Sequence, residues 1–444
     1  MSQDPTMTDP THDDAAEHEP SVSFADLGLP PALLRAIEKV GYEAASPIQA
    51  AAIPVLLEGH DLIGQAQTGT GKTAAFSLPL LTSIDLKQAR PQLLVLTPTR
   101  ELALQVSEAV QSYARQLKGL HVLPVYGGQG MEVQLRRLSR GVHVVVGTPG
   151  RIQDHLRRGT LDLSGLKSLV LDEADEMLRM GFIDDVVEIL EQTPESRQTA
   201  LFSATMPDSI VKLASGFLYE PVRVEVDPQS TTVERISQTV MYVDKSDKRR
   251  LLVDMLSRPE VESAIVFTRT KHGANRVTKV LSKAGIEAAA IHGNKSQGAR
   301  LRALAGFKSG ELRVLVATDI ASRGIDVDGV SHVFNFELPN IPESYVHRIG
   351  RTGRAGREGI AIAFCDDTEN SYLRDIEKLI GQRLQLDAEH EWHSERARTS
   401  TEPPPKRGQG QGNRGGGNRG GGGGGNRGGG RRKKPGGGGG GGGG

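Results

Sequence analysis

Cysteine is almost absent from this chain of 444 residues, which contains only Cys365. A disulfide within the chain needs two cysteines, and a multi-thiolate zinc or iron–sulfur site needs several. The sequence therefore excludes both kinds of site. The low cysteine content fits a protein of a reducing compartment.

Long apolar runs and an excess of charge of one sign are absent as well. No uninterrupted apolar run approaches the roughly 18 residues that a membrane-spanning helix needs, so we expect no membrane span and no membrane partner. The 54 Lys and Arg residues balance the 54 Asp and Glu residues. Net charge alone therefore neither indicates nor excludes a nucleic-acid partner.

The two ends of the chain differ in composition from the rest. The first 20 residues hold six acids and no Lys or Arg, which is not the pattern of a secretory signal, so we expect residues 1–22 to form a disordered acidic tail of a cytoplasmic protein. The last 44 residues hold 24 of the 54 glycines and nine basic residues against one acid. We expect residues 385–444 to form a low-complexity, Gly/Arg-rich basic tail.

Between Phe24 and about Leu384, short apolar runs alternate with longer amphipathic stretches. This alternation is typical of βα units, in which buried parallel strands are covered by helices, and it predicts an α/β fold with parallel sheets. The predicted strands are Gln92–Thr97, Val142–Gly147, Ser168–Asp172, Thr199–Ser203, Ser263–Thr268, Arg313–Thr318, His332–Phe336 and Gly359–Phe364.

A faint internal repeat indicates two similar domains. LLVLTPTRELALQVSEAV is similar to AIVFTRTKHGANRVTKV, which pairs Thr97 with Thr268 at an offset of 171. VVVGTPGR overlays VLVATDIA, which pairs Thr148 with Thr318 at an offset of 170. Any two βα units look somewhat alike, but near-constant offsets favour duplication. We expect domains at residues 23–226 and 237–384, joined by a linker at residues 227–236.

The segment AQTGTGKT leads from a glycine-rich loop into a helix-forming stretch. Glycines let backbone N–H groups approach phosphate oxygens, and the helix N-terminus favours negative charge. Lys72 would reach the β- and γ-phosphates, and the Thr73 hydroxyl would bind Mg²⁺. A Gly-Lys-Thr sequence can also be a plain helix start, and the general phosphate-loop motif has glycine where this chain has Ala66.

The apolar run SLVLDEAD ends in carboxylates. A strand end would place Asp172 beside the metal of a nucleotide, and Glu173 could orient and deprotonate an attacking water. The alternative is an acidic helix start, because carboxylates stabilise helix N-termini. The phosphate loop upstream favours the catalytic interpretation.

The segment HRIGRTGRAGR repeats arginine at intervals of three. Like charges at this density repel each other unless an anion joins them. Because the segment lies in the second repeat, it would supply arginine fingers across a cleft to a nucleotide held by the first repeat. The alternative is a solvated basic loop. The arginines are Arg348, Arg351, Arg354 and Arg357.

With these motifs in place, the chain resembles the DEAD-box ATP-dependent RNA helicases of superfamily 2 from Phe24 to about Leu384. The motifs of that family occur in order, and Ala66 is normal for it. They are GYEAASPIQ, AQTGTGKT, PTRELA, Gly127-Gly128, TPGR, LDEAD, SAT, IVFTRT, ATDIASRGIDV and HRIGRTGR.

The resemblance implies two tandem RecA-like domains that bind ATP and Mg²⁺. Gln49 and Phe24 would contact the adenine, although Ser46 and Gln49 also fit a helix capping box. Asp326 would bind the ribose, Arg351 and Arg354 the γ-phosphate, and His347 would couple to the catalytic acids. The phosphate-loop residues would be Ala66, Gln67, Thr68, Gly69, Thr70, Gly71, Lys72 and Thr73.

The resemblance also implies an RNA track and a coupling element. Asp175, Ser203 and Thr205 would couple hydrolysis to strand separation, unless Ser203 and Thr205 only end a strand. Most of the expected RNA contacts are small, hydroxylic or basic residues. Such residues bind phosphates and sugars, and these contacts carry little sequence information. The expected RNA contacts are Thr99, Arg100, Gly128, Thr148, Arg151, Thr268, Arg269, Thr318 and Asp319.

The sequence therefore predicts an RNA-stimulated ATPase that binds single-stranded RNA and locally unwinds short duplexes. The tail would hold RNA loosely or only keep the chain soluble. An ATP-gated RNA clamp or assembly platform remains an alternative, and a DNA translocase is a weaker one. We expect a monomeric core, with RNP or RNA-decay proteins as possible partners.

Overall fold

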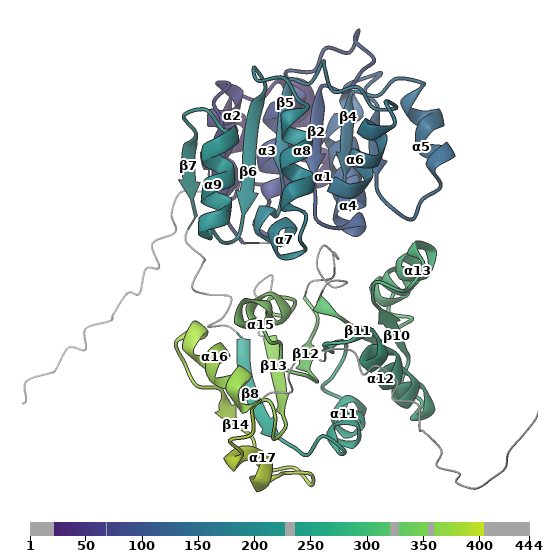
Figure 1. Cartoon of the computed structure of the whole chain (residues 1–444), viewed down its shortest axis with the longest axis vertical. Helices are drawn as coiled ribbons and strands as arrows, with labels where there is room; N and C mark the ends of the chain where they lie inside the picture. Colours follow the sequence, from purple (N-terminus) through teal and green to yellow (C-terminus); the bar gives the residue numbers. More distant parts are fainter. Residues whose placement is uncertain are drawn as a thin grey trace, which may run out of the picture. The chain divides into compact units, whose positions relative to one another are not determined.

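The structure is a computed structural model with two parallel sheets (Figure 1). We call residues 22–226 the first lobe and residues 236–403 the second lobe, and we treat each by itself. Apart from one residue each, the predicted acidic tail and linker lie outside the described residues, as does the chain beyond residue 403. The described residues are 22–67, 69–226, 236–319, 327, 329–353 and 359–403.

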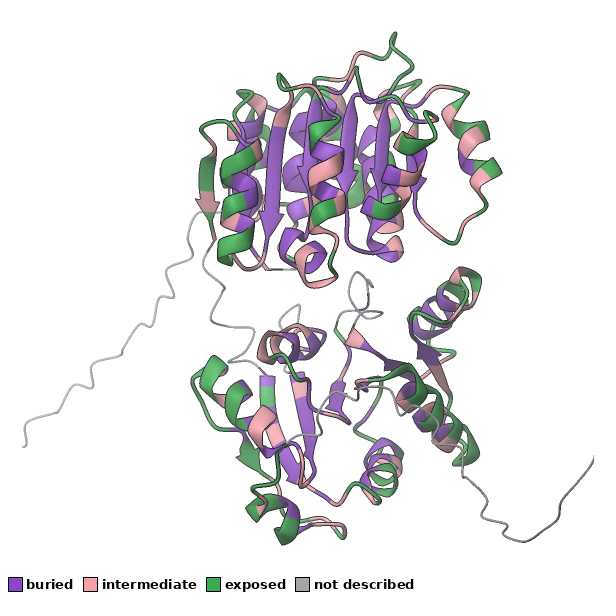
Figure 2. Ribbon diagram, in the orientation of Figure 1, coloured by how far each residue is buried: buried purple, intermediate pink, exposed green. Residues whose placement is uncertain are grey.

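The sheet of the first lobe has seven parallel strands in the order β3-β4-β2-β5-β6-β1-β7. The central strands are rich in Val and Leu and are buried along their whole length, which is typical of a parallel sheet covered on both faces (Figure 2). The strands are β1 (Leu62–Gln65), β2 (Leu93–Leu96), β3 (Val122–Val125), β4 (Val144–Gly147), β5 (Ser168–Leu171), β6 (Gln198–Ser203) and β7 (Val222–Glu225).

Helices cover both faces of this sheet. One face packs against α1 (Pro31–Val40), α2 (Pro47–Leu57), α3 (Lys72–Leu81) and α4 (Arg100–Tyr113). The other face packs against α6 (Pro149–Arg157), α7 (Ala174–Arg179), α8 (Ile183–Glu191) and α9 (Asp208–Phe217). The lobe also contains α5 (Met131–Leu138) and the short 3₁₀ helices η1 (Phe24–Leu27) and η2 (Ala114–Gln116).

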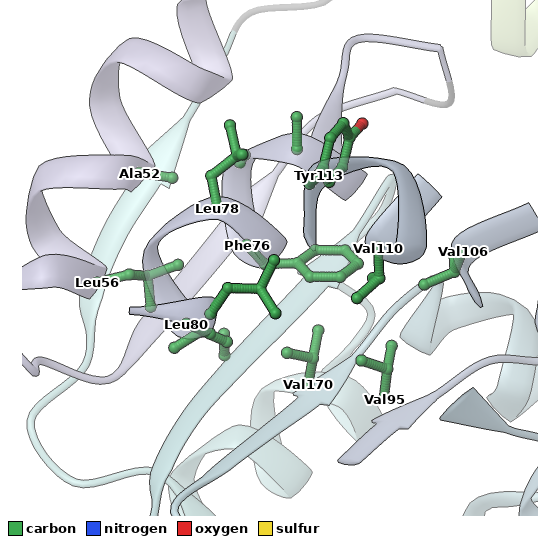
Figure 3. Close-up of a cluster of buried hydrophobic side chains, with 14 of the residues drawn as sticks. Ala52, Leu56, Phe76, Leu78, Leu80, Val95, Val106, Val110, Tyr113 and Val170 are labelled. Atoms are coloured by element: carbon green, nitrogen blue, oxygen red, sulfur yellow. The ribbon is translucent and has the colours of Figure 1, made fainter. Parts of the chain in front are cut away.

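Helix α3 lies at the centre of the first of these two layers. Phe76 of this helix is fully buried and its ring lies 5.5 Å from that of Phe202 on β6. Val95 and Val170 of the sheet and Val110 of α4 belong to the same cluster (Figure 3). Burying a side chain of this size contributes about 1.5–3 kcal/mol. The cluster therefore holds α3, and the phosphate loop that precedes it, rigidly against the sheet.

The second lobe repeats this architecture with the strand order β10-β11-β9-β12-β13-β8-β14. The predicted duplication is confirmed, because β2 and β9 occupy the same place in their sheets, and so do β4 and β11. The strands are β8 (Ile236–Tyr242), β9 (Ala264–Phe267), β10 (Ala288–Ile291), β11 (Val314–Ala317), β12 (His332–Asn335), β13 (Gly359–Cys365) and β14 (Gln385–Leu386).

The ordered part of the second lobe extends past the predicted boundary at residue 384, so that boundary is wrong. Strand β14 pairs with β8, and Asn370 donates from Nδ2 to the carbonyl oxygens of Ala397 and Ser400 at 2.7 and 3.1 Å. These hydrogen bonds attach residues beyond 384 to the lobe, although the composition of that segment alone predicts that it belongs to the tail. The helices of the lobe are α11 (Lys248–Ser257), α12 (Lys271–Lys283), α13 (Gln297–Lys308), α15 (Pro342–Ile349), α16 (Asn370–Ile380) and α17 (Glu395–Thr399).

The carboxyl ends of the strands carry the motifs that the sequence singles out. In open parallel sheets this edge is where ligands bind, because the loops that leave the strands converge there. Thr99 follows β2 and caps α4, since its hydroxyl accepts a hydrogen bond from Leu102 N at 3.2 Å. Thr270 follows β9 and caps α12 in the same way.

Among the helices of the described ranges, none is both long enough and apolar enough to span a membrane.

Candidate nucleotide and RNA site

The phosphate loop joins β1 to α3. Gly71 precedes α3 with φ = +91°, a conformation that glycine adopts without strain. A Cβ atom there would lie 2.2 Å from Gln49 Nε2, so a larger residue would also displace the Gln49 amide. Lys72 is 6% exposed and donates from Nζ to Ala66 O at 2.8 Å. The ammonium group therefore lies inside the loop, where a phosphate group would bind.

The acids of the LDEAD segment lie at the end of β5, as predicted. Asp172 is 3% exposed, and burial raises its pKa to about 7, against the opposing effect of Lys72. Burial also raises the pKa of Glu173, again opposed by Lys72. Glu173 has φ = +55°, which costs a non-glycine residue about 1–2 kcal/mol. Strain of this kind often marks a functional residue.

The donor set fits Mg²⁺ bound together with a nucleotide. Asp172 Oδ1 is buried and has no hydrogen-bond partner among the described residues, so it is a free oxygen ligand. No group of three or more His, Cys, Asp or Glu side chains in the described ranges is arranged to hold a metal ion. Mg²⁺ commonly binds through one or two protein oxygens plus substrate phosphates. Asp172 and the half-buried Thr73 could supply these protein oxygens.

Gln49 has two structural contacts beside the phosphate loop. Its Oε1 accepts from Ser46 N at 2.9 Å, which belongs to the predicted capping box. Its Nε2 donates to Gly71 O at 3.1 Å. Phe24 stacks on Tyr42, with ring centroids 5.9 Å apart. The capping function of Gln49 is thus confirmed, and its contact with adenine stays a prediction. The amide links the start of α2 directly to the phosphate loop.

The predicted coupling residues form a connected chain of hydrogen bonds. Thr205 donates from Oγ1 to Asp175 Oδ2 at 2.8 Å, and Ser203 donates from Oγ to Thr205 O at 2.6 Å. Asp175 N donates to Ser203 Oγ at 3.3 Å. The segment after β6 is therefore tied to the acidic segment after β5. Ala66 N donates to Ser203 O at 3.1 Å, so the same chain reaches the phosphate loop.

The predicted RNA contacts of the first lobe gather at one place. Thr99, Arg100, Thr148 and Arg151 line the same hollow at the ends of β2 and β4. Gly128 has φ = +87°, and a Cβ atom there would lie 2.4 Å from Arg100 Nη1. The guanidinium of Arg100 therefore lies directly on the Gly127–Gly128 turn, and a larger residue at Gly128 would be strained and would displace this guanidinium.

The predicted RNA contacts of the second lobe are buried or paired with other side chains. Thr268 is fully buried and donates from Oγ1 to Thr270 O at 3.2 Å. Arg269 Nη2 pairs with Glu369 Oε1 at 3.0 Å, and its guanidinium lies 5.5 Å from the centre of the Tyr372 ring. Thr318, which is 8% exposed, follows β11.

Asp319 is bound by Arg348, the first arginine of the predicted finger segment. Arg348 donates from Nη2 to Asp319 Oδ2 at 2.8 Å, and it also donates to Asn335 Oδ1 at 2.9 Å. His347 on α15 is half-buried, and Arg351 just beyond that helix is 7% exposed. Three further predicted residues lie outside the described residues: Thr68, Asp326 and Arg354.

The sequence analysis missed several residues that hold the predicted ones in place. Gln134 on α5 and His155 on α6 are fully buried and contact each other beside Arg151. Glu369 precedes α16 and holds Arg269. A lone polar residue in an amphipathic helix carries no motif. The only available signal was its place on a helix face that should otherwise be apolar.

Comparisons with known proteins find family models and relatives that match most of this chain. Residues 46–213 match the family model of the DEAD/DEAH box helicases, and residues 247–356 match that of the helicase conserved C-terminal domain. The chain is 48% identical over 362 residues to the DEAD-box ATP-dependent RNA helicase CshA of Bacillus cereus, which covers 82% of this chain and 69% of that protein. It is 52% identical over 371 residues to the ATP-dependent RNA helicase DeaD of Mycobacterium tuberculosis, covering 83% and 66%.

A solved structure shows the same fold. The chain is similar to S. cerevisiae Dbp5 bound to RNA and ADP BeF3, with a TM-score of 0.75 and 35% sequence identity. The match covers 82% of this chain and 95% of that one. The two lobes therefore correspond to tandem RecA-like domains.

Proposed function

This chain belongs to the DEAD-box family of ATP-dependent RNA helicases, and we propose that it couples ATP hydrolysis to binding of single-stranded RNA and to local unwinding of short RNA duplexes. The observation that carries the proposal is the hydrogen-bond chain from Asp175 through Thr205 and Ser203. It joins the hydrolytic acids to the segment after β6 and, through Ala66, to the phosphate loop.

The hydrolytic step follows from the buried acids and Lys72. Water attacks the γ-phosphorus as the bond to the β–γ bridging oxygen breaks, and Glu173 accepts the proton of the water. Asp172 and Thr73 would hold Mg²⁺, which would supply positive charge that offsets the charge of the phosphates. Lys72 binds the β- and γ-phosphates, and Arg351 and Arg354 stabilise the charge that develops in the transition state.

ATP and RNA together favour a closed arrangement of the two lobes in this proposal. Each ligand then raises the affinity for the other, because the closed state alone contacts both. His347 and the fingers of the second lobe complete the nucleotide site, and Asp326 binds the ribose. A track that accepts a bent single strand but not a duplex would separate a few base pairs, and phosphate release would free the RNA.

In the proposed track the protein contacts the phosphates and sugars of the RNA rather than the edges of its bases. In the first lobe these contacts come from Thr99, Arg100, Gly128, Thr148 and Arg151, whose hydroxyl, guanidinium and backbone N–H groups are of the kind that binds phosphates. Such contacts position an RNA strand without reading its sequence. We further propose a monomeric cytoplasmic core, with RNP or RNA-decay proteins as partners.

The test is strand displacement from a short RNA duplex, with the parent protein compared with Glu173→Gln. We expect the parent to displace many strands per molecule while ATP lasts. Glu173→Gln should still bind ATP and RNA, but its turnover should fall by about 10²–10⁴-fold, the usual contribution of a general base. Arg157→Ala is the matched control, because Arg157 forms an exposed ion pair with Glu188 in the same lobe.

Two results would replace the proposal. A parent protein that releases at most one strand per molecule, with ATP binding alone sufficient, would be an ATP-gated RNA clamp. An ATPase stimulated by DNA and not by RNA would be a DNA translocase. Turnover of Glu173→Gln equal to that of the parent would remove Glu173 from the mechanism.

A further inference from the structure

A buried glutamine lies between the RNA-contact segments of the first lobe. Gln134 on α5 is fully buried. Its Nε2 donates to Tyr126 O at 2.9 Å and to Gln129 Oε1 at 3.0 Å. Its Oε1 accepts from Arg151 Nη1 at 3.1 Å and lies 2.9 Å from His155 Nε2. Both donors and both acceptor positions of the amide are therefore in use.

This full set of contacts determines the orientation of the amide. If the amide were flipped, its NH₂ group would face the guanidinium of Arg151, which can only donate. Because Gln134 Oε1 can only accept, His155 Nε2 must carry a proton. The other ring nitrogen, Nδ1, lies 2.9 Å from Thr160 Oγ1. His155 is fully buried, so α6 supports the glutamine from behind.

The same glutamine holds both sides of the Gly127–Gly128 turn. It binds Tyr126 O just before the turn and the Gln129 side chain just after it. Arg151 Nη1 donates to Gln129 O at 3.2 Å. The turn, its overlying Arg100 and the guanidinium of Arg151 are thus joined through one side chain.

The contacts leave Arg151 charged and able to donate. Its close acceptors are a carbonyl and an amide oxygen, and the nearest carboxylate oxygen is Asp154 Oδ2, 3.9 Å from Nε. That carboxylate pairs more closely with Arg158, at 2.7 Å. In the described part of the chain Arg151 Nη2 has no hydrogen-bond acceptor, so it is the group that a phosphate oxygen can bind.

We propose that Gln134, supported by His155, is a positioning residue for RNA: it holds the Gly127–Gly128 turn and the Arg151 guanidinium together as one binding unit for a phosphate of the RNA backbone. The inference rests on the proposed function, since it assumes that Arg151 contacts RNA. Gln134 itself touches no RNA. Its effect on RNA binding passes entirely through Arg151 and the turn.

A double-mutant cycle tests this dependence. The full-length protein and the variants Gln134→Ala, Arg151→Ala and the double variant are titrated with a fluorescent single-stranded oligouridylate in the presence of a non-hydrolysable ATP analogue. A lost charge-assisted hydrogen bond should weaken binding by about tenfold in Arg151→Ala. Gln134→Ala should weaken it about three- to tenfold. The double variant should lose less affinity than the sum of the two single losses, because coupled residues are non-additive.

The salt dependence of binding gives a readout that a merely structural role would not change. Each phosphate contact to a single strand contributes about −0.7 to the slope of log affinity against log salt. Arg151→Ala should make the slope shallower by about 0.7. Gln134→Ala removes no charge, so a shallower slope in this variant can come only from a displaced cation. Arg157→Ala on the same helix is the control and should leave both affinity and slope unchanged.

The outcomes separate the inference from the proposed function. Additive losses in the cycle, or a parental slope in Gln134→Ala, would overturn the positioning role. If Arg151→Ala itself binds RNA like the parent, the assignment of Arg151 to the RNA track fails, and the positioning role fails with it. ATP affinity and the thermal midpoint of each variant report whether it folds. The variant His155→Gln can still donate to Gln134 Oε1, so it should retain the RNA affinity and the salt slope of the parent.

Discussion

Arg151 in the first lobe and Arg269 in the second follow strands that occupy neighbouring places in equivalent sheets, yet they are held by opposite chemistry. Arg151 is bound by the neutral amide of Gln134 and a carbonyl. Arg269 is bound by the carboxylate of Glu369, which is fully buried. The first arrangement leaves a net positive charge at the surface of the lobe, and the second cancels it.

The carboxylate of the second lobe belongs to a larger buried cluster. Lys248, which is 1% exposed, pairs with Glu369 and with Asp366 Oδ2, the latter at 3.0 Å. Burial raises the pKa of Glu369, and the charge of Lys248 opposes this rise. Two cations thus share two carboxylates, and their charges balance. A buried group of this kind stabilises the lobe only while all its members are present.

We infer from the comparison that an arginine's surroundings, in addition to its motif, determine how well it can bind an RNA phosphate. The same reasoning applies to Arg348, which is buried against Asp319 and lies 5.0 Å from the centre of the Phe267 ring. A guanidinium already paired with a carboxylate gains less from a phosphate. We therefore expect the first lobe to supply most of the salt-dependent RNA affinity of the folded core.

The largest expected effect is the loss of stability in Glu369→Gln. The substitution leaves Lys248 and Arg269 with only Asp366 as a buried counter-charge. Breaking a buried ion pair from one side costs about 3–5 kcal/mol, which should lower the thermal midpoint by roughly 6–15 °C. Differential scanning calorimetry measures this shift.

Glu395→Gln is the matched control for that substitution. Glu395 pairs with Arg398 on α17 at 2.7 Å, but its side chain is 58% exposed. An exposed pair contributes less than about 1 kcal/mol, so the control should shift the midpoint by no more than about 3 °C. If Glu369→Gln melts like its control, the balanced buried cluster does not stabilise the lobe as described.

The next effect is on RNA affinity, in Gln134→Glu. A carboxylate at this position can still accept from Arg151 and His155 and gives Arg151 the partner that Glu369 gives Arg269, but it can no longer donate to Tyr126 O and Gln129 Oε1. We expect affinity for single-stranded RNA to fall about tenfold and the salt slope to become shallower by about 0.7. Fluorescence titration at several salt concentrations measures both. A salt slope equal to that of the parent would mean that RNA binding does not use the charge of Arg151. The contrast between Arg151 and Arg269 would then fail.

Several elements of the fold could be predicted from the sequence. The buried runs around Val95, Val145, Val170 and Val266 became central strands because continuous apolar stretches need a sheet covered on both faces. Strand β10, with its sequence AAAI, was missed because alanine does not distinguish a strand from a helix. The extension beyond residue 384 was missed because its attachments, such as the pairing of β14 with β8 and the bonds of Asn370, join residues far apart in the sequence.

The site was predicted unevenly for a similar reason. Lys72, Asp172 and Thr205 lie in contiguous motifs whose backbone path places their side chains, so their positions could be inferred. The resemblance assigns Arg269 to RNA, whereas its partner Glu369 lies 100 residues away in the sequence and could not be inferred. Pairing between distant residues leaves no local pattern, and only the folded lobe reveals it.

A smaller effect should distinguish Arg269 from Arg151 directly. Arg269→Ala removes a cation–π contact and one ion pair of Glu369, so we expect a loss of about 1–2 kcal/mol in stability. Its RNA salt slope should change by less than about 0.2, against about 0.7 for Arg151→Ala. The two variants are compared in one titration series. Equal changes in slope would restore the sequence prediction that Arg269 contacts phosphate.

The smallest expected effect tests the neutrality of the first-lobe cluster. Burial, followed by the charge of Arg151, lowers the pKa of His155, while Asp154 opposes this and Arg158 adds to it. The unfolded chain takes up this proton near pH 6.5, but the folded chain does so only at lower pH. The stability that His155 contributes is therefore complete above about pH 6.5 and is lost as the pH falls toward the folded pKa.

His155→Gln isolates that contribution, because glutamine can donate to Gln134 Oε1 but does not titrate. Between pH 7.5 and pH 5.5 the thermal midpoint of the parent should fall by about 1–3 °C more than that of the variant, the shift expected for a change of up to about 1 kcal/mol. Other buried histidines, such as His332, contribute equally to both proteins and cancel in the difference. Equal losses in parent and variant would show that the folded lobe protonates His155 as easily as the unfolded chain does. The amide of Gln134 would then face a charged imidazole over this pH range, and the contrast with the ionic cluster around Glu369 would no longer hold.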